Sequence, residues 1–101
     1  MHRKSAYLRL LADAIRDRHG LPAVHVQTVF VSLLDAANGE IRRDIEVFAI
    51  MTSCEARKCF AWKNLHREPV ILLATPEVNS PEEALRSACA AGPAVTSPPK
   101  A

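Results

Sequence analysis

The chain has 101 residues, of which 49% are hydrophobic and 24% are charged, and these values are typical of one folded domain and exclude a chain disordered by composition. Thirteen Lys and Arg against eleven Asp and Glu give a formal charge of +2, and the basic residues are scattered, so charge alone does not indicate a nucleic-acid or membrane surface. No apolar run approaches the roughly 20 residues that cross a bilayer, and an odd number of cysteines without an export signal indicates the reducing cytoplasm.

The first predicted element is an amphipathic helix over residues 5–19. Apolar residues recur there at helical spacing, while charged residues occupy the opposite side. Gly20 is suited to the position that follows a helix, and Pro22 prevents the helix from continuing. We therefore expect the helix to end at His19.

Four strands are predicted next, over residues 24–34, 40–52, 58–64 and 69–75. The first two are rich in β-branched residues and flank Asn38-Gly39, a dipeptide that favours a two-residue hairpin turn. The connections between neighbouring strands are short, and short connections join antiparallel strands. The sequence therefore predicts an antiparallel meander.

A second helix is predicted after the last strand. The segment Ser80-Pro81-Glu82-Glu83 is a capping box with proline at the first helical position. Gly92 and Pro93 end the helix after about Ala91. We thus expect a single α+β domain over residues 1–92 and a flexible, proline-containing tail over residues 93–101.

The predicted order α-β-β-β-β-α corresponds to a two-layer sandwich, with a four-stranded antiparallel meander and both helices on one face. If Asn38-Gly39 is a two-residue turn, Ala37 pairs with Glu40, and strand alternation sorts the side chains. The face beneath the helices then carries the following residues: Val24, Val26, Thr28, Phe30, Leu34, Ile41, Ile45, Val47, Ala49, Met51, Phe60 and Trp62.

The other face of the predicted sheet is expected to meet water, and part of it is polar, through His25, Gln27, Asp35, Arg42, Asp44, Glu46 and Lys63. The same face also carries apolar residues, which are Val29, Val31, Leu33, Phe48, Ile50, Cys59 and Ala61. A monomer has little reason to leave so many apolar groups in water, and exposed patches of this kind mark interfaces. We interpret this face as a partner surface that pairs with a second copy in a sheet-to-sheet homodimer. The alternative is a β-bulge in the first strand that turns Val29, Val31 and Leu33 inward.

The predicted function is that of a small, non-catalytic binding or assembly module without cofactor, metal or membrane partner. Val29, Val31, Leu33, Phe48 and Ile50 would make the contact with a protein partner or a second copy, and Arg42, Asp44 and Glu46 would form a charged rim. Replacing Phe48 by Asp is expected to dissociate the assembly and leave the fold intact. Nothing in the sequence identifies a small ligand.

A second hypothesis concerns the segment TSCEARKCFAW, in which Cys54 and Cys59 are reactive-thiol candidates. Arg57 and Lys58 would favour the thiolate of Cys54, and His66 from the next connection would help to form a small-molecule or thiol-enzyme pocket. No cysteine-hydrolase signature surrounds Cys54. The cysteine spacing is loose for zinc and no second pair exists, so we expect no metal site.

The third and lowest-ranked hypothesis is weak nucleic-acid binding through Arg3, Lys4, Arg9 and Arg16. The order of elements resembles that of double-stranded RNA-binding domains, in topology only. Those domains grip phosphates with cations at the start of the last helix, where this chain has two glutamates in the sequence SPEEAL.

Overall fold

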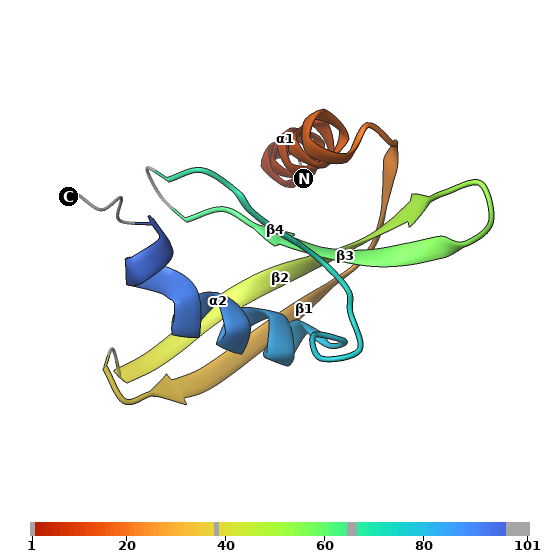
Figure 1. Cartoon of the computed structure of the whole chain (residues 1–101). Coiled ribbons are helices and arrows are strands. Elements are labelled where there is room, and N and C mark those ends of the chain that lie inside the picture. The colour runs from red at the N-terminus through yellow and green to blue at the C-terminus, as the bar shows by residue number, and fades with distance from the viewer. Residues whose placement is uncertain (1, 38, 65–66, 97–101) are drawn as a thin grey trace.

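The computed structural model describes residues 2–37, 39–64 and 67–96. The elements follow the predicted order and are α1 (His2–His19), β1 (Ala23–Asp35), β2 (Gly39–Met51), β3 (Ala56–Trp62), β4 (Val70–Leu73) and α2 (Pro81–Thr96). The strands form one sheet in the order β1-β2-β3-β4, and every neighbouring pair is antiparallel (Figure 1). The predicted α+β class and the antiparallel meander are confirmed.

Both helices begin or end where their local sequence signals lie. Gly20 has a φ of 73°, and its amide donates a 2.7 Å hydrogen bond to the carbonyl of Arg16, so α1 ends at His19 as predicted. At α2, the amide of Glu83 donates to Oγ of Ser80 over 3.2 Å. Oε1 of Glu83 accepts a bond from the Asn79 amide at 2.9 Å, which completes the cap.

The end of α2 differs from the prediction. The helix runs to Thr96 and includes both Gly92 and Pro93, which were expected to end it. Proline lacks one backbone donor and disfavours a helix interior, but a single missing bond in the last turns does not force the chain out of the helix. Residues 93–96 are thus helical, whereas the rest of the predicted tail, residues 97–101, lies outside the described residues.

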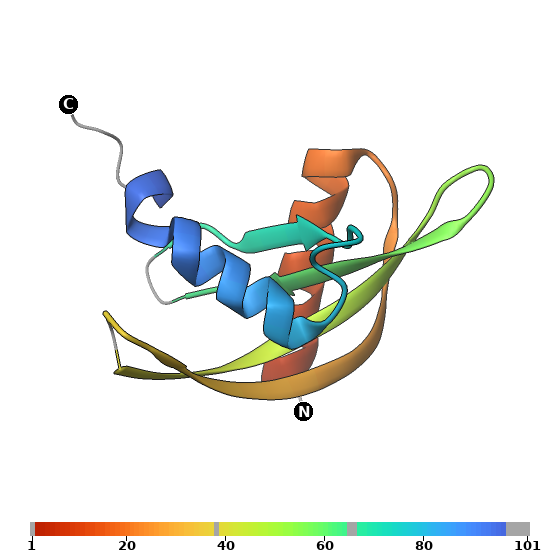
Figure 2. The ribbon, with the colours of Figure 1, turned by 60° about the horizontal axis from the view of Figure 1, so that its bottom comes forward.

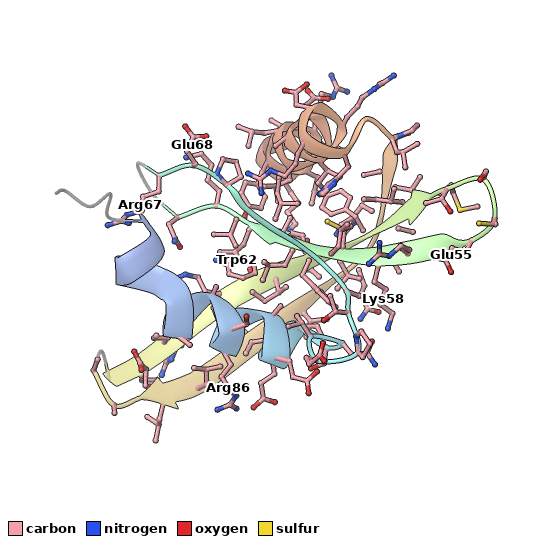
Figure 3. The ribbon with its side chains drawn as sticks, viewed as in Figure 1. Glu55, Lys58, Trp62, Arg67, Glu68 and Arg86 are labelled. Atoms are coloured by element: carbon pink, nitrogen blue, oxygen red, sulfur yellow. The ribbon has the colours of Figure 1, made fainter. Side chains whose placement is uncertain are left out.

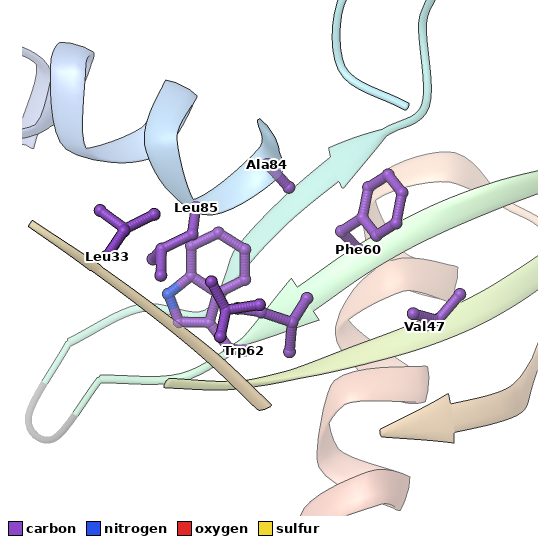
Figure 4. Close-up of a cluster of buried hydrophobic side chains, with 8 residues drawn as sticks. Leu33, Val47, Phe60, Trp62, Ala84 and Leu85 are labelled. Atoms are coloured by element: carbon purple, nitrogen blue, oxygen red, sulfur yellow. The ribbon is translucent and has the colours of Figure 1, made fainter. Parts of the chain in front are cut away.

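The two helices lie on opposite faces of the sheet, which corrects the prediction that both cover one face. Figure 2 shows α1 behind the sheet and α2 in front of it. The side chains confirm this arrangement, because they form two separate clusters. On the α1 face the buried residues are Leu11, Ile15, Phe48, Ile50, Cys59, Ala61 and Ile71. On the α2 face they are Val31, Leu33, Ile45, Val47, Phe60, Trp62, Ala84 and Leu85 (Figure 4).

The physical reason lies in β2 and β3, which are apolar on both of their faces. Phe48 and Cys59 point to one side and Val47 and Phe60 to the other, and all four side chains are buried. A sheet with two apolar faces needs a cover on each of them. One helix per face meets this need within a single chain.

The register of the β1–β2 hairpin also differs from the prediction. Asp35 pairs with Gly39, which leaves a connection of residues 36–38 instead of the expected two-residue turn. Gly39 has a φ of 78°, the positive value that glycine adopts readily. Val29 therefore pairs with Ile45 and not with Phe48. This shift by an odd number of residues turns the side chains of β1 to the other face of the sheet.

A β-bulge does occur in β1, as the alternative hypothesis required. It lies between His25 and Gln27, before the residues it was expected to turn. The hairpin connection, not the bulge, places Val29, Val31 and Leu33 on the α2 face. The bulge adds one residue upstream, so that His25 still shares a face with its partner Phe48.

Candidate functional site

The structure buries most of the residues that were predicted to form a partner surface. Val31, Leu33, Phe48 and Ile50 are 6%, 8%, 1% and 2% exposed, and Val29 packs against the α2-face cluster. Phe48 and Ile50 are covered by α1, and Val31 and Leu33 by α2. The proposed contact surface is thus occupied by the chain's own helices, and the predicted site is wrong in these four positions.

The predicted charged rim divides into an exposed part and a buried part. Arg42 is exposed and its Nε donates a 3.2 Å bond to Oε2 of Glu40. Asp44 is exposed as well. Glu46, by contrast, is completely buried. Only the first two can border a contact surface.

The apolar side chains that remain in water include Phe30 and Leu34, which are 62% and 80% exposed and which the sequence had assigned to the core. Phe30 pairs with Asp44 and Leu34 with Glu40, so strand alternation places both on the α1 face. They are uncovered because the β1–β2 hairpin extends well beyond α1 (Figure 1). Among the residues that the structure describes, the other exposed large apolar side chains are those of Leu10, Val24, Val26 and Met51.

Strand β1 lies at one edge of the sheet, and in the described part of the chain no strand pairs with its outer side. It spans 13 residues, and from Ala23 to Leu34 it contains no Lys, Arg, Asp, Glu or Pro. Edge strands of monomeric proteins are usually short, charged or interrupted by proline, since an open edge can pair with another chain. The opposite edge, β4, follows this rule with four residues preceded by Pro69.

A groove of about 370 Å³ runs beside the middle of this edge. One side is formed by Val29, Phe30, Val31 and Ser32, and the other by Ser80, Pro81 and Glu82 at the start of α2. The helix therefore leaves open space next to the edge. An extended segment that paired with β1 would run along this groove.

A partly buried polar cluster joins α1 to the sheet on the α1 face, and at its centre is the fully buried Glu46. Oε2 of Glu46 accepts a bond from Nζ of Lys4 at 2.6 Å, and Oε1 lies 2.8 Å from Nε2 of His25. The hydroxyl of Thr28 donates to Oε1. The ring of His25 meets that of Phe48 edge-on at 5.3 Å between centroids. All of these partners satisfy the carboxylate, so the cluster has a clear structural role.

The titration of Glu46 reflects this environment. Burial by itself would raise the pKa of the carboxyl, but the hydrogen bonds from Lys4, Thr28 and His25 outweigh burial, and the pKa lies below its ordinary value. No sequence pattern indicates this cluster, because Lys4 is 42 residues from Glu46. Only the position of α1 on the sheet brings the two together.

The two thiol candidates lie in different environments. Cys54 is exposed in the β2–β3 connection, which projects away from both helices near Glu55 (Figure 3). Cys59 is completely buried, and burial raises the pKa of its thiol to about 11 despite Arg18 and Arg57 nearby. Cys59 is therefore not a reactive thiol under neutral conditions. His66, the proposed partner of Cys54, lies outside the described residues.

The basic residues of the third hypothesis all lie on α1, in different environments. Lys4 is engaged by the buried Glu46, while Arg9 and Arg16 are exposed. The side chain of Arg3 lies outside the described part of the chain. Within residues 2–37, 39–64 and 67–96, His, Cys, Asp and Glu side chains form no group of three or more that could hold a metal ion. Among the same residues, no helix is long and apolar enough to cross a membrane.

Comparison with family models, curated proteins and solved structures finds no match to this chain.

Proposed function

We propose that this protein is a small, non-catalytic binding or assembly module whose contact surface is the open edge of β1. The observation that carries the proposal is the length and composition of that edge. The strand has thirteen residues and is uncharged from Ala23 to Leu34, and among the described residues its outer side pairs with no other strand and borders an open groove. An exposed strand of this kind binds a partner by β-strand addition, in which main-chain hydrogen bonds extend the sheet.

Phe30 and Leu34 supply the apolar side-chain contacts of this surface. Both project from β1 on the α1 face and are largely exposed. Arg42 and Asp44, on the neighbouring strand, form the charged border. Main-chain pairing gives affinity, and alternate side chains along the strand give selectivity.

Strand addition can be tested without knowing the natural partner. A blocked peptide of alternating valine and threonine is titrated into the ¹⁵N-labelled protein, and backbone amide shifts are followed by NMR. We expect shift changes along β1 and at Ser80 and Glu82, the two residues beside the groove at the start of α2 that carry a backbone amide. The same peptide with N-methyl groups on alternate amides cannot form a ladder and should cause none. Changes confined to other elements, or no changes with either peptide, would contradict the proposal.

A pair of matched variants distinguishes binding at the β1 edge from nonspecific association through exposed apolar side chains. Phe30→Lys places a charge on the edge strand, the device by which natural edges avoid pairing, and should abolish the peptide-induced shifts. Leu10→Lys changes an exposed apolar residue of α1, which is 43% exposed, and should leave them unchanged. Equal responses from the two variants would show that β1 is not the contact.

A further inference from the structure

We infer that the segment which pairs with β1 is the same segment of a second copy, in an antiparallel arrangement centred on Ser32. This inference rests on the proposed function and names its partner. Two copies related by a two-fold axis would join their sheets edge to edge, β1 against β1. The two four-stranded sheets would then form one continuous sheet that runs through both copies.

The spacing of the exposed apolar side chains fixes the register. Phe30 and Leu34 lie on one face of β1, four residues apart, with Ser32 midway between them. In an antiparallel pair centred on Ser32, Phe30 of each copy lies directly opposite Leu34 of the other. Phe30, which is 62% exposed in one copy, is thus covered by Leu34 of the other copy, which is 80% exposed when alone.

The remaining pairs of this register are also compatible. Ser32 meets Ser32 on the axis, and Val31 meets Leu33 of the second copy next to the α2-face core. Asp35, the only charged residue of β1, lies opposite Val29 and not opposite its own equivalent. No like charges are therefore brought together along the paired strands, which a self-pairing edge requires.

The geometry of the edge leaves room for this partner. The groove between residues 29–32 and residues 80–82 borders the strand over the part that would be paired. An edge-to-edge contact of one strand per copy is small compared with stable dimer interfaces. We therefore expect a reversible dimer whose population rises with protein concentration.

Cysteine cross-linking tests the register directly. In a Cys54→Ser background, which removes the exposed thiol, Ser32→Cys would place two thiols opposite each other on the axis. Their Cα atoms would be about 4.5 to 5.5 Å apart, within disulfide range. Gln27→Cys is the control, because Gln27 is exposed and lies outside the proposed contacts, and its two copies would be offset by ten residues, or about 34 Å.

After oxidation with glutathione disulfide, we expect a covalent dimer linked through position 32 and none through position 27, as read by non-reducing electrophoresis and peptide mapping. Sedimentation equilibrium of the unmodified chain should show a dimer that Phe30→Lys abolishes. Cross-linking at position 27 as readily as at 32, or at neither, overturns the register. If the chain stays monomeric at every concentration, the partner of β1 is not a second copy. The peptide titration then decides separately whether β1 binds other strands.

Discussion

Nζ of Lys4 donates a 2.6 Å hydrogen bond to Oε2 of Glu46, and this bond ties the first turns of α1 to the middle of β2. The carboxylate is fully buried, whereas the lysine side chain is 44% exposed. The bond thus satisfies a buried charge from the surface and holds the helix across the sheet.

Replacing Lys4 by Met should lower the free energy of unfolding by about 1 kcal/mol, because Glu46 stays buried but loses one donor. The value lies at the low end for bonds to charged groups, since solvent screens the half-exposed ammonium. Urea denaturation followed by circular dichroism measures the change. Arg9→Met, which removes an exposed cation from the same helix, is the control and should be near neutral. Equal losses in both variants would mean that the pair itself contributes nothing.

The stability of the fold should depend on pH through Glu46. The pKa of this carboxyl is lower in the folded protein than its ordinary value of 4.5, so the charged form stabilises the fold above that value. The contribution is lost as the pH falls through the folded-state pKa. Unfolding free energies measured from neutral pH to below 4.5 should therefore fall less steeply for Glu46→Gln than for the unmodified chain. Parallel curves would assign the acid sensitivity to other carboxyls.

Two phenylalanines provide a matched test of the corrected register. Phe48 is 1% exposed and Phe30 is 62% exposed. Phe48→Ala should cost about 3–5 kcal/mol of stability through lost burial and a cavity, whereas Phe30→Ala should change it by no more than about 0.5 kcal/mol. Denaturation followed by the fluorescence of Trp62, the single tryptophan, reports both values. The opposite ranking would restore the register in which Phe30 is core.

The same assignment changes what is expected of Phe48→Asp. From the sequence alone, this variant was expected to dissociate an assembly and keep its fold. In the structure the aspartate would enter the α1-face cluster without a partner, so we expect the variant to unfold. Circular dichroism decides between the two outcomes, because a folded, soluble Phe48→Asp protein would show that α1 does not cover this residue.

The cysteines should differ sharply in reactivity. Iodoacetamide at neutral pH is expected to modify Cys54 in the folded protein at an ordinary rate, because its side chain is exposed. Cys59 should react only after unfolding, since it is buried and its pKa is raised to about 11. Peptide mass mapping after short exposures distinguishes the two. Fast labelling of Cys59 in the native state would mean that α1 opens from the sheet.

Local signals in the sequence determined the helices, the strands and their order. Gly20 ends α1, and Ser80 with Glu83 begins α2, through contacts within a few residues of each other. The alternation and β-branched content of the strands indicated a meander in the same way. Such signals can be recognised in the sequence because the residues that interact are only a few positions apart. The end of α2 is the exception, since the helix continues through Pro93.

The location of the candidate site was determined by two features that no local sequence signal indicates. Connections of two and three residues are both ordinary hairpin solutions, yet the three-residue one, which pairs Asp35 with Gly39, reverses which side chains of β1 face α2. The sequence likewise showed two apolar sheet faces but not how they are covered. Tertiary packing settled both points, because each apolar face needs its own helix. Val31 and Leu33 lie under α2 and Phe48 lies under α1, whereas Phe30 and Leu34 remain in water.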